Sequence, residues 1–505
     1  MLESMNASSR RACCTIKNQA TNIGPKRKEI GRPHAKQVGV PRPGLTKTCF
    51  VFLCCVCHLA HSILPSHNPP WPPTYNMTES LITMQCNSSG WSSPERASQF
   101  GIVSYDWSNA KALWAAAKPM TCEELLNDQA RKAKAAGTKH VFVYRNIVKA
   151  LPWFRTTRSK LDDPAYSGFF LRFDPDAAPS YHVPPCAAEN NTHCSAFYHD
   201  QEQTPEVPTS DDPDPDGRCD GHCDCGLHPC GEYLFDHRNG TMLQEFLVKE
   251  VVLGALLMDD ATKTSSSTVA ADTNTKLVDG IFLDDYWCSD LLCQEDPTIA
   301  GCPCDDPVQG PTEIDPHSQL DMGLTDEDIR AVTLGWNDTM TAIHRALLDH
   351  EAYTWSLIAG QENANAKPIL MTRDTCQSLL REACQLDSRW QRLPLLFGFS
   401  VTNHTMLTQL EEDLAFFLLA RGEYTLAGWG VWGMTWPFNP EPQHGTLPPL
   451  PHGVPLPKEF LLDYGIPRME VCEEIEQGIF FRQWSSASVQ LDCNTFQARI
   501  ELTTG

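Results

Sequence analysis

Two adjacent carboxylates, Asp284 and Asp285, stand directly after a short apolar run in this 505-residue sequence. Four apolar residues between Val278 and Leu283 are typical of a strand that is buried on both faces of a parallel sheet. Barrel enzymes place their reactive groups at the carboxyl ends of such strands, so the pair indicates a catalytic or binding site. The alternative role is structural, because strand-end aspartates also cap the next element or bind a cation.

A third acid, Glu362, follows the next predicted strand along the chain. Cleavage of a glycosidic bond needs two carboxyl groups, one as general acid and one as nucleophile or base, roughly 5–9 Å apart. Adjacent barrel strands would bring Asp284 and Glu362 to that separation. Successive side chains point to opposite faces of a strand, so we expect only one of Asp284 and Asp285 to face the pocket fully. We assign Asp284 and Glu362 as the catalytic pair, with Asp285 as the substitute for Asp284 and a plain loop acid as the alternative for Glu362.

Polar residues at the ends of the other predicted strands are candidate substrate ligands. Arg145 could orient a carboxylate or a sugar hydroxyl, although strand-end polar residues also satisfy loop backbone groups. Tryptophans are candidates of another kind, because an indole face suits the apolar face of a sugar ring, but they also fill cores. The candidates for substrate binding are Tyr105, Asp106, Arg145, Asn146, Asp236, His237, Trp287, Trp429, Trp432 and Trp436.

We predict neither an organic cofactor nor a catalytic metal. The histidines form no HExxH pattern, the serines form no GxSxG elbow, and no GxGxxG or Walker motif follows a strand. Residues 219–230 hold four cysteines and two histidines, which would suit a zinc knot. The absence of paired CxxC units there favours loops joined by disulfides, and the acidic loop at 211–224 is more typical of solvated chain than of a calcium site.

Seven recognisable strands alternate with helical patterns along the chain. This alternation predicts βαβ units and a mostly parallel sheet. With an eighth strand hidden in an irregular region, it favours an α/β fold of the (β/α)8 barrel type over an open doubly wound sheet. The expected strands lie at residues 101–105, 140–144, 232–235, 278–283, 353–359, 395–399 and 425–431.

Capping signals mark two of the expected helices. Thr121 with Glu124 three residues on predicts a capping box, and Gly137 follows the last turn of that helix. Thr325 begins a second helix, and further helices are expected at residues 242–257, around 376–384 and at 406–419. The apolar residues of the second helix recur at intervals of three and four, which predicts a single buried stripe: Ile329, Val332, Trp336, Met340, Ile343 and Leu347.

Composition divides the chain into segments. A basic tail over residues 1–48 carries a charge of +8 within a total of −23, which leaves −31 for the rest. This strongly negative charge argues against nucleic acid or an anionic membrane as the partner of the rest of the chain. We expect a linker over 65–95, a barrel over 96–452 with disulfide-bearing insertions near 175–230 and 288–324, and a C-terminal strand segment over 453–505.

Several features predict delivery to the secretory pathway. Residues 49–64 hold a 15-residue apolar stretch, which suits a signal peptide, although the long basic leader also fits a signal-anchor or a start site placed too early. Sixteen cysteines from Cys86 onward would allow eight disulfides. N-glycosylation sequons stand after the apolar stretch at Asn76, Asn87, Asn190, Asn239, Asn337 and Asn403.

The run Asp279-Gly280-Ile281-Phe282-Leu283-Asp284-Asp285-Tyr286 resembles the DGIxLDDY signature of glycoside-hydrolase-like barrels and, more distantly, a strand of the α-amylase superfamily. In that superfamily the nucleophile lies five residues after the leading Asp, which corresponds to Asp284. Residues 236–239 are similar to the segment before that strand. Near the C-terminus, residues 463–467 and 481–494 resemble the terminal strand segments of such proteins.

The resemblance implies a (β/α)8 barrel that hydrolyses an O-glycosidic bond in an oligosaccharide or glycan. The sequence departs from the amylase pattern at Phe282, where that pattern has Arg, and it has no counterpart of the late-strand Asp within residues 395–404. A glycan on Asn239 would also crowd a pocket that used Asp236. A catalytically inactive carbohydrate-binding or cell-surface protein on the same barrel is therefore the alternative to a hydrolase.

Overall fold

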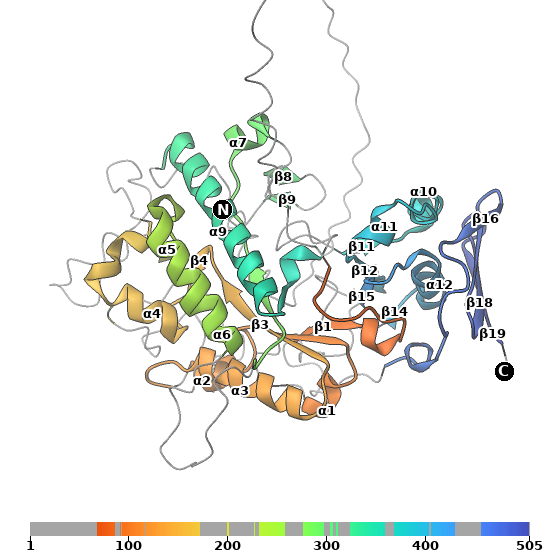
Figure 1. Ribbon diagram of the computed structural model, residues 1–505, viewed down its shortest axis with the longest axis horizontal. Coiled ribbons are helices and arrows are strands. Elements are labelled where there is room, and N and C mark those ends of the chain that lie inside the picture. The colour runs from red at the N-terminus through yellow and green to blue at the C-terminus, as the bar shows by residue number, and fades with distance from the viewer. Residues whose placement is uncertain are drawn as a thin grey trace, which may run out of the picture.

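The computed structural model describes residues 68–85, 91, 93–115, 117–171, 199–200, 227, 232–257, 276–296, 304–306, 310–311, 324–358, 368–402, 406–429 and 456–503. Among them, one parallel sheet has the strand order β1-β2-β3-β7-β10 and a second has the order β11-β12-β15 (Figure 1). An isolated parallel bridge between Leu81 and Ala427 joins β1 to β15. The fold is therefore mixed α/β with parallel sheets, as predicted, although no pairing closes β10 onto β11 in the described chain.

The parallel strands are short and buried. Gly280 begins the Asp-pair strand because a Cβ there would lie 2.4 Å from the ring of Phe142 and 2.5 Å from the carbonyl oxygen of Tyr353. Only glycine permits so close an approach between neighbouring strands. The strands are β1 (Ile82–Gln85), β2 (Ile102–Tyr105), β3 (His140–Asn146), β7 (Gly280–Asp284), β10 (Tyr353–Thr354), β11 (Ile369–Leu370), β12 (Leu396–Phe399) and β15 (Leu426–Trp429).

Helices surround the parallel strands (Figure 1). The longest described helix, α9, buries all of the predicted apolar stripe except Met340, which is partly buried. The helix predicted at 242–257 continues through a π-helical turn at Leu247–Leu253. The α-helices are α1 (Pro94–Ala97), α2 (Lys111–Trp114), α3 (Cys122–Ala135), α4 (Arg155–Leu161), α5 (Gly240–Phe246), α6 (Gly254–Leu257), α7 (Asp290–Glu295), α9 (Asp326–Asp349), α10 (Arg373–Ala383), α11 (Arg389–Arg392) and α12 (Leu410–Ala420).

Two strand predictions were wrong. The linker expected over 65–95 contains β1, which pairs in register with β2 and follows the fully buried Leu81. Conversely, the strand predicted at 232–235 does not join the parallel sheets. It forms β6 (Glu232–Leu234), which pairs antiparallel with β4 (Lys149–Ala150) and β5 (His199–Asp200). Both strands are short: β1 lies in a Pro-rich segment, and β6 pairs with β4, which is distant in sequence, so local patterns did not reveal their places in the fold.

The C-terminal segment forms strands, as expected, in one antiparallel sheet beside α12 (Figure 1). Its strands are β16 (Glu473–Glu476), β17 (Ile479–Gln483), β18 (Ala487–Asp492) and β19 (Gln497–Leu502). Two disulfides, Cys376–Cys493 and Cys384–Cys472, join it to α10 and the residue after it. Two small antiparallel pairs complete the strands, β8 (Asp305–Asp306) with β9 (Gly310–Pro311) and β13 (Val401–Thr402) with β14 (Met406–Leu407).

Disulfides are present, but the expectation of eight was wrong. Cys122 carries a free, buried thiol, so the sixteen cysteines cannot all pair. A third disulfide, Cys288–Cys304, joins the segment after β7 to residues further along the predicted insertion. The apolar stretch at 49–64 lies outside the described residues. No described helix is both long and apolar enough to cross a membrane.

Candidate functional site

The two aspartates after β7 lie beside the end of β3. Strand pairing sets Asn146 opposite Asp284, so both carboxylates meet polar side chains of β3. The Tyr144 hydroxyl donates to Oδ2 of Asp284 at 3.1 Å, and Nδ2 of Asn146 donates to Oδ2 of Asp285 at 2.6 Å. Asp285 is buried, whereas Asp284 is partly exposed. Asp284 is thus the less buried residue of the pair, although its Oδ1 is a buried atom.

The expectation that the two carboxylates point to opposite sides of the strand was wrong. Asp285 has a φ of 60°, in the left-handed region that costs a non-glycine residue about 1–2 kcal/mol. This conformation ends the extended pleat, so the side-chain alternation of β7 stops at Asp284. Both acids therefore contact one hydrogen-bonded unit, in which Nδ2 of Asn146 also donates to the Tyr144 hydroxyl at 3.0 Å.

Asn146 is the rigid centre of this unit. Its Oδ1 accepts from the backbone amides of Val148 at 2.8 Å and Lys149 at 2.7 Å, while its Nδ2 donates to Tyr144 and Asp285. A carboxamide has two acceptor sites and two donor hydrogens, so all four are used. The side chain consequently has a single orientation that satisfies every bond, and it fixes both acids relative to β3.

A lysine reaches the same cluster from β4. The ammonium of Lys149 lies 2.9 Å from Oε2 of Glu232 on β6 and 3.6 Å from Oδ2 of Asp285. The antiparallel pairing of β4 with β6 holds this cation beside the ends of the parallel strands. The cluster therefore combines several acids with a positive charge whose side chain is 14% exposed, and a nearby opposite charge favours the ionised form of a carboxylate.

Tyr144 supplies a neutral donor within the cluster. Burial raises its pKa well above the usual range, and the charges of Asp284, Asp285 and Asp106 raise it further. The phenol keeps its proton and donates a hydrogen bond to the Asp284 carboxylate. Asp106, which follows β2, is near enough to influence Tyr144, and its own Oδ1 accepts from the Ser108 amide at 2.8 Å. The ends of β2, β3 and β7 therefore converge on Tyr144.

Two predicted ligands on β2 and β3 face away from the cluster. Nη2 of Arg145 lies 3.6 Å from Oε1 of Glu123 on α3, and the buried Tyr105 hydroxyl is near enough to Gln129 on the same helix for Gln129 to influence its pKa. Period-two alternation explains this, because Arg145 lies between Tyr144 and Asn146 on the opposite face of β3. Both residues attach α3 to the sheet and do not line the site.

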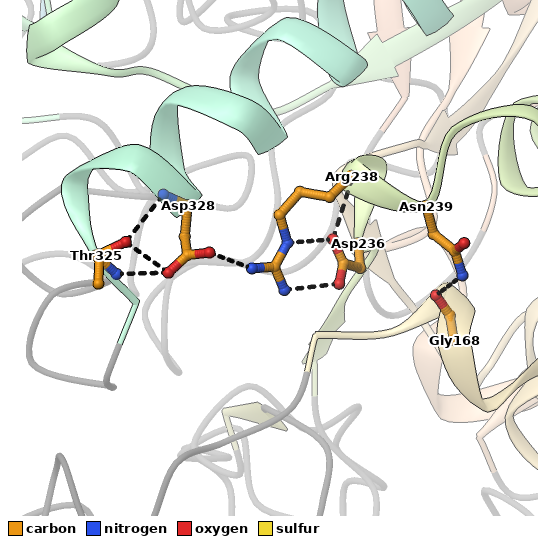
Figure 2. A network of polar contacts seen from close by, with 6 residues as sticks. All are labelled: Gly168, Asp236, Arg238, Asn239, Thr325 and Asp328. Atoms are coloured by element: carbon orange, nitrogen blue, oxygen red, sulfur yellow. Dashed lines mark hydrogen bonds and ion pairs between the residues drawn. The ribbon is translucent and has the colours of Figure 1, made fainter.

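Asp236 and His237 also serve the fold rather than the cluster. Asp236 forms an ion pair with Arg238, which reaches Asp328 in the capping box of α9 (Figure 2). His237 is buried, and its Nε2 lies 2.7 Å from the Ile147 carbonyl oxygen. Nδ2 of Asn239, the sequon residue, donates to the Gly168 carbonyl oxygen at 2.7 Å (Figure 2).

Neither of the two candidate tryptophans that the structure describes, Trp287 and Trp429, can be a sugar platform. Trp287 and Trp429 are both completely buried, and Trp429 stacks on Phe460 with ring centroids 5.9 Å apart. Both are core residues, which was the alternative role for these side chains. Glu362, Trp432 and Trp436 lie outside the described residues, as do the 219–230 cysteine cluster and the acidic loop at 211–224.

Sequence reasoning missed Tyr144, Lys149 and Glu232. Alternation along β3 could have revealed Tyr144, because it shares a face with Asn146, which was selected. The sequence carries no comparable signal for Lys149 and Glu232, because their role depends on antiparallel pairing between residues 149 and 234. Glu232 begins the strand predicted at 232–235, but a long segment of unpatterned sequence separates it from Lys149, so the pairing of the two strands could not be predicted.

A metal centre finds no support in the described residues. The sulfur atoms of Cys288, Cys293 and Cys304 lie within 4.8 Å of one another, but Cys288 and Cys304 are joined in a disulfide. A disulfide lacks the thiolate charge that zinc requires. Comparison with known proteins adds no assignment, because no protein-family model matches the sequence and no curated protein matches it.

Proposed function

We propose that this protein is a glycoside hydrolase that cleaves an O-glycosidic bond in an oligosaccharide or glycan without an organic cofactor. One observation carries the proposal: Asp284, a partly exposed residue, stands at the carboxyl end of a buried parallel strand, and its carboxylate accepts a hydrogen bond from neutral Tyr144. Enzymes with parallel β/α architecture place their reactive groups at such strand ends. The resemblance of residues 279–286 to a glycosidase signature supports the same conclusion.

The architecture that we propose is a (β/α)8 barrel. Across the two sheets and the Leu81–Ala427 bridge, the parallel strands lie in the order β10-β7-β3-β2-β1-β15-β12-β11. Read as a circle, this is the order of the strands along the chain. A doubly wound sheet would instead reverse its order at a switch point. Closure of β10 onto β11 would complete the barrel and place the acids at one end of it.

The catalytic roles follow from exposure and hydrogen bonding. We assign Asp284 as the nucleophile or base, because it is the less buried of the two aspartates and Tyr144 orients its carboxylate. Glu362 remains our candidate for the general acid, since it follows β10, the neighbour of β7. Trp432 and Trp436, which follow β15, remain candidates for packing against a sugar ring.

We also infer that the protein is delivered to the secretory pathway, with residues 49–64 as its signal peptide or signal-anchor. The three disulfides between described cysteines support this inference, because such bonds persist in oxidising compartments and are rare in the cytosol.

The test is release of sugar from a panel of oligosaccharides and chromogenic glycosides by the wild type and by variants. We expect Asp284→Asn and Glu362→Gln each to lower kcat by at least ~100-fold, the usual contribution of a catalytic acid or base. Asp279→Asn is the matched control, because Asp279 precedes the same strand and binds Lys134 at 2.8 Å. It should lower stability and leave kcat unchanged.

The competing function is carbohydrate binding without turnover. The burial of Asp285 favours it, since a buried carboxylate cannot act on a glycosidic bond in the observed conformation. Saturable glycan binding by a wild type that cleaves no member of the panel would replace the hydrolase proposal with this one. Equal loss of kcat in Asp279→Asn and Asp284→Asn would also contradict the assigned role of Asp284.

A further inference from the structure

Lys149 places a positive charge among acids that have almost no contact with solvent. The side chain of Lys149 is 14% exposed, and those of its partners Glu232 and Asp285 are 9% and 2% exposed. Charges that are so poorly hydrated interact strongly, and a buried charge that loses its partner is strongly destabilising. The state of the ammonium therefore governs whether both carboxylates can remain ionised.

Several of the acids that the structure describes gather in this cluster. Asp285 and Glu232 both pair with the Lys149 ammonium, and the charges of Asp284, Asp285 and Asp106 act on the phenol of Tyr144. Neighbouring like charges oppose one another's ionisation, so a cation has a large effect on where a proton resides.

We propose that Lys149 is a positioning residue that keeps Asp285 and Glu232 ionised and so leaves Asp284 as the carboxylate presented to substrate. The catalytic consequence rests on the proposed hydrolase function, whereas the charge coupling does not. Without the ammonium, one of the two carboxylates takes up a proton. A protonated Asp285 is a poorer acceptor for Nδ2 of Asn146, which also supports the Tyr144 hydroxyl that orients Asp284.

The charge coupling is tested by denaturation, without reference to any substrate. Lys149→Met should lower the unfolding midpoint more at pH 8 than at pH 5, because protonation relieves the unpaired carboxylates at acid pH. Lys160→Met is the matched control: the Lys160 side chain is 13% exposed, but its partner Glu250 is 52% exposed, so its loss should be small and independent of pH. Equal losses in the two variants at both pH values would overturn the proposal.

Two further variants separate charge from packing. Lys149→Arg keeps the positive charge and should retain most of the stability. Adding Glu232→Gln to Lys149→Met removes one orphaned acid and should raise the midpoint, although Glu232→Gln alone lowers it. If Lys149→Met does not fold, folding of the double variant supports the coupling. Failure of the double variant to recover any stability contradicts it.

The catalytic consequence is read from the pH profile of kcat/KM on a glycoside that the wild type cleaves. Lys149→Met should move the acid limb upward by about one pH unit, a tenfold loss on that limb, and Lys149→Arg should restore it. An unchanged acid limb overturns the positioning role. If the wild type cleaves no glycoside, the hydrolase proposal and the positioning role fail together, while the denaturation experiment still decides the charge coupling.

Discussion

Consecutive side chains of β3 serve different neighbours. Tyr144 and Asn146 contact the two aspartates after β7, whereas Arg145 between them binds Glu123 on α3. One strand therefore joins the candidate site to a covering helix through residues that are adjacent in sequence. Selecting every polar residue at a strand end, as the sequence analysis did, cannot separate these two groups unless the alternation of the strand is applied.

At the scale of single residues, His237 makes the stability of the protein depend on pH. Burial lowers its pKa to about 4 from an ordinary value of 6.5, so the folded protein keeps it neutral where the unfolded chain protonates. Because the unfolded state then binds more protons, stability is lost as the pH falls from 6.5 towards 4. Between pH 7.5 and 4, the wild type should lose about 3 kcal/mol more than His237→Gln, measured by urea denaturation. Parallel stability curves would show that His237 is protonated in the fold.

At the scale of elements, Thr325 and Thr121 each precede a helix and carry a similar capping signal in the sequence. Their side chains are nevertheless bonded differently in the structure. Thr325 forms a complete capping box with Asp328 at the start of α9, and Arg238 then links Asp328 to Asp236 (Figure 2). Thr121 precedes α3 and makes no side-chain capping bond, so the capping box predicted there was wrong. Its ψ of 29° departs from the extended conformation that a capping residue adopts.

The two caps predict different costs for the same substitution. Thr325→Ala should destabilise the protein by about 1 kcal/mol, because two hydrogen bonds of the capping box are lost. Thr121→Ala should change stability by less than about 0.5 kcal/mol, because no capping bond exists to remove. Thermal denaturation of both variants measures the difference. A comparable loss at Thr121 would mean that its hydroxyl does cap the helix.

Elements with strong periodic patterns were predictable, and those defined by distant pairing were not. The stripe of α9 and the β7 motif were identified from local spacing, and both are present. β1 was missed because only four residues form it within a Pro-rich segment, and it owes its place to pairing with β2. The same holds for the candidate site. Asn146 was predicted because it stands at a recognisable strand end, whereas Lys149 was missed because it reaches the acids through the antiparallel strand β4.

At the scale of the whole molecule, the C-terminal sheet is attached to the parallel-strand region by both charge and covalent bonds. Arg482 on β17 is buried, and its Nη1 donates to the carbonyl oxygens of Leu419 at 3.0 Å and Arg421 at 2.7 Å. These oxygens end α12, where a cation is favourable. Disulfides join the same sheet to α10 and the residue after it.

The length of chain that each disulfide encloses predicts its contribution to stability. Cys376 and Cys493 are separated by 117 positions, and Cys288 and Cys304 by 16. The Cys384–Cys472 disulfide lies within the longer loop and shortens it to about 30 residues, so loop-closure entropy makes the Cys376–Cys493 link worth about 0.5 kcal/mol more. Replacing Cys376 and Cys493 with serine should therefore lower the free energy of unfolding more than replacing Cys288 and Cys304, measured by guanidinium denaturation. The reverse order would show that local strain outweighs chain entropy.

The free, buried thiol of Cys122 can report local unfolding at the start of α3. It lies at the first position of α3, 3.8 Å from the Trp107 carbonyl oxygen, and burial raises its pKa well above the ordinary value. Such a thiol is inert until it is exposed, so a maleimide can label it only when this helix start separates from its surroundings. The labelling rate therefore reports how often that opening occurs, in a protein that needs no engineered cysteine for the measurement.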